Sequence, residues 1–192
     1  TSTFAQNVID ATESIAIEVP VMDLGGLPEN IRSQAIERGQ SAGKMCAILS
    51  GDAVCVTNVL RFATSRSVRE QIWHAFYTRA STGPLDNRGL LEEILSLRQE
   101  KASLLGFKNI IELRLKTRMI GDEAAADTFL DGLVHASRQQ AAQEQSSLLS
   151  FARDNALIPS GESLQPWDVK FVAEIQRQDT CDFQDALLAP YT

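Results

Sequence analysis

NRGLLEEILSLRQEKASLLGFKNIIEL, residues 87–113, predicts two helices joined by a tight corner. Large apolar residues recur in it at helical spacing and form a stripe wide enough for burial on more than one side. The stripe consists of Leu90, Leu91, Ile94, Leu95, Leu97, Leu104 and Leu105. Gly106 follows the last leucine, where a left-handed residue commonly ends a helix. Asn109 can then cap a second helix with Glu112 at its third position, so the stretch predicts architecture and contains no evident catalytic group.

Further helices are predicted on both sides of this corner. Pro28 suits the first turn of a helix, and Gly39 and Gly43 leave that helix a small face that another backbone can approach closely. Ser65 can cap a helix that runs to about Ala80. Three more helices are predicted after the corner, at residues 122–155, 166–178 and 182–190.

One β-prone region precedes the helices, within residues 15–57. Residues 46–49 and 53–57 flank Ser50-Gly51-Asp52 and predict a β-hairpin, which becomes a three-stranded element if the alternating strand 15–19 joins it. A small structural flap is the commoner role for such an element than an edge strand that binds an extended peptide. The predicted fold class is therefore mainly α, with long helices and tight corners. Residues 1–192 are expected to form one helical segment, helical from 58 to 192.

Composition excludes several classes of function. The chain has 44% hydrophobic and 22% charged residues, as soluble globular proteins do, and a net charge of −7. Nucleic acid and anionic membranes are not expected partners, because both need a positive face. No apolar run reaches the roughly 20 residues of a membrane span, and no basic-then-apolar leader opens the sequence. We therefore expect a cytoplasmic protein, whose three cysteines (Cys46, Cys55 and Cys181) are free thiols.

Catalytic motifs are absent from the sequence. The two histidines, His74 and His135, lie outside any His-Glu-x-x-His helix, and no Gly-x-Ser-x-Gly elbow or phosphate loop occurs. The acidic pairs Glu92-Glu93 and Asp122-Glu123 fall in first turns of helices, where carboxylates complement the helix dipole. Trp167-Asp168 is interpreted as an anchor at a helix start. No catalytic or metal-binding residue is assigned, the substrate-binding residues are left open, and a serine or cysteine nucleophile assembled only by the fold is a remaining alternative.

Four stretches carry a family resemblance. They are Phe4-x-x-Asn7-Val8-x-Asp10-Ala11-Thr12 with Gly26-Leu27-Pro28-Glu29; Arg66-x-x-Arg69-Glu70 with Tyr77-x-Arg79-Ala80-Ser81; Leu91 to Asn109; and Leu164-Gln165-Pro166-Trp167-Asp168 with Pro190-Tyr191. In this order, across nearly the whole chain, they resemble the thimet oligopeptidase family of zinc metallopeptidases, which includes bacterial oligopeptidase A.

The resemblance implies a middle segment of a larger peptidase of short peptides, whose helices form the wall of a deep channel. In that family a zinc site on a His-Glu-x-x-His helix, farther along the chain, carries out hydrolysis. This chain is therefore expected to need no cofactor of its own and to be inactive alone. Its expected partners are the catalytic portion of the same protein, or a second copy bound through exposed apolar surface. The alternative is a non-enzymatic helical interaction module derived from the same family.

Overall fold

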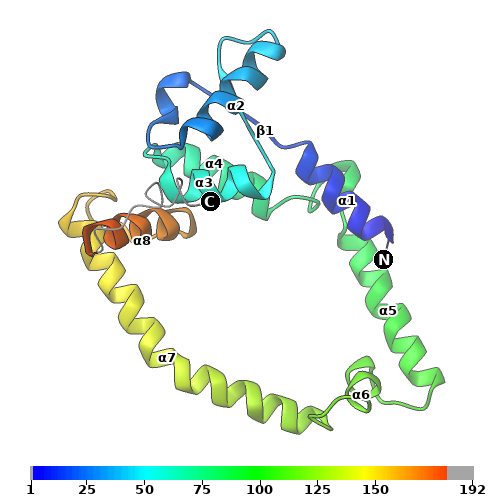
Figure 1. Ribbon diagram of the computed structural model, residues 1–192. Coiled ribbons are helices and arrows are strands. Elements are labelled where there is room, and N and C mark those ends of the chain that lie inside the picture. Colours follow the sequence, from blue (N-terminus) through cyan, green and yellow to red (C-terminus); the bar gives the residue numbers. More distant parts are fainter. Residues whose placement is uncertain (1, 181–192) are drawn as a thin grey trace, which may run out of the picture. The chain divides into compact units, whose positions relative to one another are not determined.

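The computed structural model describes residues 2–180 and is mainly helical, as predicted (Figure 1). Its α-helices are α1 (Ser2–Glu13), α2 (Glu29–Ser41), α3 (Ala53–Phe62), α4 (Arg66–Tyr77), α5 (Arg88–Leu104), α6 (Ile110–Leu115), α7 (Glu123–Asp154) and α8 (Pro166–Thr180). Two strands, β1 (Ala16–Val19) and β2 (Ala47–Ser50), and two short 3-10 helices, η1 (Val21–Leu24) and η2 (Gly83–Leu85), complete the described elements. The helix predicted at 182–190 lies outside the described residues. None of the helices within residues 2–180 combines the length and the apolar character that crossing a membrane requires.

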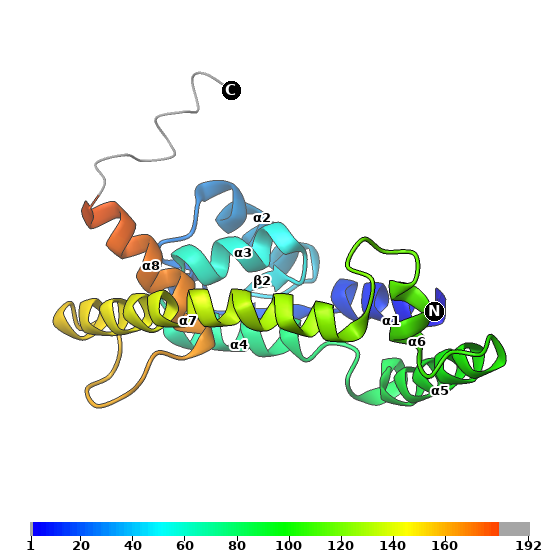
Figure 2. The ribbon, with the colours of Figure 1, turned by 90° about the horizontal axis from the view of Figure 1, so that it is seen from below.

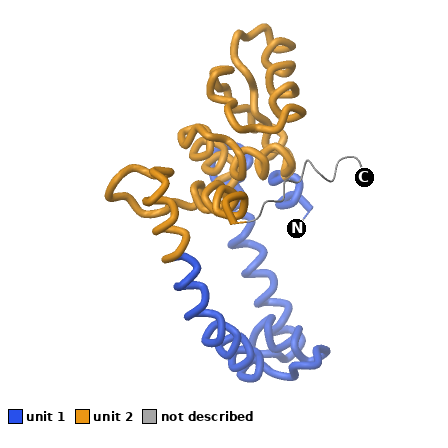
Figure 3. The backbone as a smooth tube through the Cα atoms, turned by 60° about the vertical axis from the view of Figure 1, so that its left-hand side comes forward, with its two compact units in different colours: residues 1–8, 80–145 blue, residues 9–79, 146–192 orange. Residues whose placement is uncertain are grey.

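The described residues divide into two compact units (Figure 3). Unit 1 contains residues 2–8 and 80–145, and unit 2 contains residues 9–79 and 146–180. The divisions fall inside α1 and inside α7.

Unit 2 contains the larger hydrophobic core. β1 and β2 pair antiparallel, from Ala16 opposite Ser50 to Val19 opposite Ala47, and α2 packs against β2 (Figure 2). Helices α3, α4 and α8 pack on one another. The most deeply buried apolar side chains of this core include Val19, Leu24, Leu49, Val59, Leu60 and Ile72.

The β-hairpin predicted around Ser50-Gly51-Asp52 is wrong in its second strand, although the expected small β element exists. Residues 53–57 begin helix α3, and β2 pairs with β1 instead. Asp52 caps this helix, because its carboxylate Oδ1 accepts a hydrogen bond of 2.8 Å from the backbone N–H of Cys55. Cys55, Val56, Val59 and Leu60 are then buried together at helical spacing, and this burial overrides the β propensity of the short run.

The prediction of a close backbone approach is confirmed at Gly39. A Cβ atom there would lie 1.8 Å from the carbonyl oxygen of Cys46, which only glycine permits. Gly43 has a different role, because it takes a positive φ of 69° where α2 ends. The N–H of Gly43 donates to Gln40 and that of Lys44 donates to Gly39, each at 2.9 Å, which closes the last turn.

In unit 1 the start of α5 is fastened to α1 by Asn87, which is only 5% exposed. Asn87 accepts a hydrogen bond of 2.9 Å from the Asn7 side chain and donates one of 2.9 Å to the carbonyl of Phe4. Its backbone N–H donates to the carbonyl of Ala80 at 2.9 Å. Asn87 therefore links the start of α5 to the first resemblance stretch through its side chain, and to Ala80 of the second stretch through its backbone.

The corner predicted between residues 87 and 113 is confirmed. Gly106 has a φ of 78°, its N–H donates to Ser103 at 3.0 Å, and the N–H of Phe107 donates to Ala102 at 2.9 Å. Asn109 caps α6 by accepting a hydrogen bond of 2.8 Å from the N–H of Glu112. The Glu112 carboxylate accepts a hydrogen bond from the backbone N–H of Lys108, and not from that of Asn109.

The burial predicted for the leucine stripe of α5 is wrong within residues 2–180. Ala102 is the one buried residue of the helix, while Leu91, Leu95 and Leu104 are 47%, 54% and 80% exposed. Helix α5 packs against α6, which spans only Ile110–Leu115 and is too short to cover the stripe. The apolar surface is therefore encoded in the sequence but not covered by the described residues.

Candidate functional site

Unit 2 contains a buried ionic cluster centred on Asp168, at the start of α8. The carboxylate is 0% exposed and accepts hydrogen bonds from Arg66 and Arg69 of α4. Arg66 reaches it at 2.9 Å and Arg69 at 3.0 Å. The backbone N–H of Gln165 donates to the same carboxylate at 3.2 Å. Asp168 therefore fastens α8 to α4 and completes the turn that leads into its own helix.

The second partner in this cluster, Arg69, is only 1% exposed. Its guanidinium also donates to the carbonyls of Ala63 and Thr64, at 2.8 and 3.2 Å, and to that of Trp167 at 3.2 Å. It stacks over the ring of Phe171, with Cζ 4.0 Å from the ring centroid. Each of the three guanidinium nitrogens thus donates at least one hydrogen bond, as a buried guanidinium requires.

Electrostatics keep this cluster ionised. Burial alone would raise the pKa of Asp168, but the hydrogen bonds from Arg66 and Arg69 outweigh it and hold that pKa below its usual value. The hydrogen bond to Asp168 raises the pKa of Arg66, and burial lowers that of Arg69. A carboxylate held anionic between two guanidinium groups is a poor proton donor or acceptor at neutral pH, so its role is structural.

Aromatic rings surround one side of the cluster. The Trp167 ring lies 5.7 Å from that of Trp73 and 5.3 Å from that of His74, centroid to centroid. Trp73 also stacks on Tyr77 at 5.0 Å. These contacts support the interpretation of Trp167-Asp168 as an anchor at the helix start.

A second ionic cluster, which was not predicted from the sequence, links α3 to α8. Glu174 is 5% exposed and accepts hydrogen bonds from Arg177 at 2.7 Å, Arg61 at 2.8 Å and Gln178 at 2.8 Å. These contacts, led by that of Arg177, lower the pKa of Glu174 to about 2. The spacing of Glu174 and Arg177 on one helix is the only signal for the cluster that the sequence contains.

No group of three or more His, Cys, Asp or Glu side chains in residues 2–180 is placed to hold a metal ion. His74 lies exposed on α4 and His135 lies exposed on α7. The acidic pair Glu92-Glu93 lies in the second turn of α5, and Asp122 caps α7 by accepting a 2.8 Å hydrogen bond from Ala125. The described residues therefore do not fit the zinc ion that the family resemblance implies.

The cysteines are confirmed as free thiols where the structure describes them. Cys55 is buried in the core and Cys46 is half-buried on the way into β2. Burial raises the pKa of Cys55, which keeps this thiol protonated and unreactive. Cys181 lies outside the described residues.

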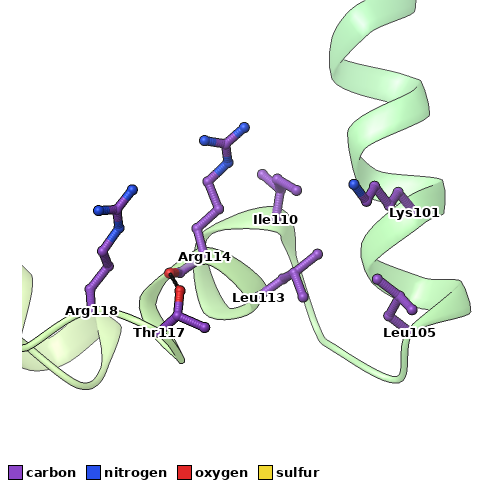
Figure 4. A pocket seen from close by; sticks show the side chains of 7 residues that line it. All are labelled: Lys101, Leu105, Ile110, Leu113, Arg114, Thr117 and Arg118. Atoms are coloured by element: carbon purple, nitrogen blue, oxygen red, sulfur yellow. Dashed lines mark hydrogen bonds between the residues drawn. The ribbon is translucent and has the colours of Figure 1, made fainter.

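A groove of about 370 Å³ lies in unit 1 at the corner between α5 and α6 (Figure 4). Lys101 and Leu105 line it from the end of α5, and Ile110, Leu113, Arg114, Thr117 and Arg118 line it from α6 and the turn that follows. No role was predicted for these side chains from the sequence. The sequence feature that indicates this groove is the concentration of Lys and Arg between residues 98 and 118.

Comparison with known proteins agrees with the resemblance. The family model of peptidase family M3 matches residues 59–192. The probable cytosolic oligopeptidase A of Arabidopsis thaliana is 33% identical over 196 residues, covering 98% of this chain and 28% of the relative. Oligopeptidase A of Escherichia coli (strain K12) is 31% identical over 194 residues, covering 98% and 28%. Dipeptidyl carboxypeptidase of the same organism is 28% identical over 197 residues, covering 100% and 28%.

The match includes elements of both units. It covers the last residues of α3 and the whole of α4 to α8, and with them the Arg66–Asp168–Arg69 cluster and the α5–α6 corner. The chain spans about 28% of the length of these relatives. This chain belongs to peptidase family M3.

Proposed function

We propose that this chain is a helical portion of an oligopeptidase of this family, and that its helices form part of the wall of a channel that admits short peptides. In this proposal, zinc-dependent hydrolysis takes place at a site that other residues of the protein supply. The relatives named as oligopeptidases support the peptide class, and the absence of a suitable ligand cluster in residues 2–180 supports a separate zinc site. We propose the cytoplasm as its location.

The observation that carries this proposal is the exposed apolar surface of α5 and α7. Phe129, Leu130, Leu133 and Val134 follow one another along α7 and are 50–57% exposed. On α5, Leu91, Leu95 and Leu97 of the leucine stripe are 47–54% exposed. Large apolar patches on a soluble protein mark surfaces that another protein surface covers. A helical wall packed against the remainder of a peptidase would bury them.

The test is the activity of the isolated chain. Purified protein is assayed for zinc content and for cleavage of a quenched-fluorescence peptide, with Escherichia coli oligopeptidase A as the positive control. We expect substoichiometric zinc and no turnover above a blank without enzyme. Stoichiometric zinc or robust cleavage would overturn the proposal.

The same exposed surface favours one alternative, a non-enzymatic interaction module in which two copies cover each other's apolar helices. Sedimentation velocity over a concentration series distinguishes the two functions. A stable dimer that dissociates when Phe129 and Leu133 are replaced by serine would favour the module. A His-Glu-x-x-His motif in the coding sequence downstream of Thr192 would favour the peptidase portion.

A further inference from the structure

The groove at the α5–α6 corner combines an apolar floor with a cationic rim. Leu105 of α5 faces Ile110 and Leu113 of α6 across it. Figure 4 shows Arg114 and Arg118 projecting in the same direction, and Lys101 reaching from α5 toward α6. The groove volume of about 370 Å³ falls within the roughly 300–1,000 Å³ of ligand pockets, at the size of a few residues of a peptide.

These three cations have no anionic partner in unit 1. The side chains of Lys101, Arg114 and Arg118 form no ion pair and no side-chain hydrogen bond with any residue in the range 2–180. Thr117 bonds only the backbone carbonyl of Arg114, at 3.4 Å. Arg114 at the end of α6 and Arg118 in the turn that follows project in the same direction, so their like charges repel each other. A bound anion would relieve that repulsion.

The charge around the groove is opposite in sign to the net charge of the chain. Residues 98–118 contain six Lys or Arg and two Glu, a net charge of +4, in a chain whose net charge is −7. The positive charge is thus gathered on the segment that forms the groove. Such a local field attracts an anionic ligand to this place in preference to the rest of the acidic surface.

We propose that this groove binds an acidic peptide, whose carboxylates pair with Lys101, Arg114 and Arg118 and whose apolar side chains lie on Leu105, Ile110 and Leu113. Arginine forks match carboxylates in geometry and charge. The apolar floor distinguishes a peptide from inorganic phosphate or a nucleic acid backbone, neither of which presents apolar groups at the spacing of neighbouring carboxylates. Binding requires no hydrolysis, so failure of this proposal leaves the proposed function as it stands, and the reverse is also true.

Fluorescence anisotropy of the full 192-residue chain with labelled ten-residue peptides tests the proposal. One peptide alternates Glu with Leu, and its neutral counterpart carries Gln in place of every Glu. We expect binding of the acidic peptide only, and binding that weakens as salt screens the charges. The double variant Arg114→Gln with Arg118→Gln should lose about fourfold to twenty-fivefold in affinity, since each exposed charge pair contributes about two- to fivefold.

The matched control is the double variant Arg98→Gln with Lys116→Gln, which removes the same charge from the same segment outside the groove lining. It should bind the acidic peptide within about twofold of the unmodified chain. All four side chains are exposed, so circular dichroism should show unchanged helix content. The proposal is overturned if both double variants lose affinity equally, if the Gln peptide binds as tightly, or if an oligonucleotide of equal charge binds more tightly.

Discussion

Replacement of Asp168 by asparagine should destabilise unit 2 more than any surface substitution of equal size. The carboxylate is 0% exposed and Arg69 is 1% exposed, so the substitution leaves a buried guanidinium without a counter-charge. Breaking a buried pair by removing one partner costs about 3–5 kcal/mol. The asparagine oxygen can still accept one hydrogen bond from Gln165 or Arg69, which places the expected loss near the lower end, about 3 kcal/mol.

Urea unfolding monitored by tryptophan fluorescence measures this loss. Trp73 and Trp167 lie with ring centroids 5.7 Å apart beside the cluster, so their emission reports on the docking of α8. Glu162→Gln is the matched control, because Glu162 pairs with Arg66 at 2.7 Å but is 47% exposed. An exposed pair of this kind contributes at most about 1 kcal/mol.

A double-mutant cycle separates the ion pair from simple loss of packing. Asp168→Asn is combined with Arg69→Met, and the interaction energy should exceed about 1 kcal/mol, because each single variant leaves a buried charge that the double variant removes. The reasoning is refuted if Asp168→Asn costs no more than Glu162→Gln, or if the two effects at Asp168 and Arg69 simply add.

Three further predictions concern the acid response, the close backbone approach at Gly39 and the cap of α3. Because the pKa of Glu174 is lowered to about 2 from 4.5, the unfolded chain takes up protons first as the pH falls. Stability should therefore decrease between about pH 5 and pH 2. The urea midpoint of Glu174→Gln should change less over that window than that of the unmodified chain. An equal decrease in both proteins would contradict a contribution of the Glu174 carboxylate to stability. Gly39→Ala should cost about 1–3 kcal/mol or more, because its Cβ would lie 1.8 Å from the carbonyl oxygen of Cys46. Gly132→Ala, in an open part of α7, should instead stabilise by about 0.5–1 kcal/mol in thermal unfolding, and equal effects would refute the steric argument. Asp52→Ala should cost about 1 kcal/mol in urea unfolding by removing the cap of α3, whereas an unchanged midpoint would contradict the capping role.

Local signals in the sequence predicted most of the helical architecture. Gly106 and Asn109 marked the corner between α5 and α6 because their requirements are local: a positive φ in one case, and a side-chain acceptor for a free N–H in the other. The same holds for Asp122 at the start of α7. Gly39 was predicted to permit close approach, but only the fold shows that Cys46 is what approaches it.

One error arose where two local patterns competed, and the other where a pattern did not show its partner. Residues 53–57 are apolar and partly β-branched, so they read as a strand, yet Asp52 caps them as a helix and the core buries one helical face. The leucine stripe of α5 was expected to be buried, because an apolar helix face is typical of burial. The pattern does not show which part of the protein covers that face. Its exposure within residues 2–180 shows that a pattern of this kind describes a surface to be covered and not what covers it.

The sequence by itself determined the family, the helical class, the caps and the concentration of positive charge at 98–118, since each depends on residues close together along the chain. Only the tertiary structure decided that Asp168 lies between Arg66 and Arg69, about one hundred residues away, and that Lys101 shares a groove with Arg114 and Arg118. Ion pairs and grooves depend on distances of a few ångströms between helices. Those distances follow from how the core packs, which no local pattern records.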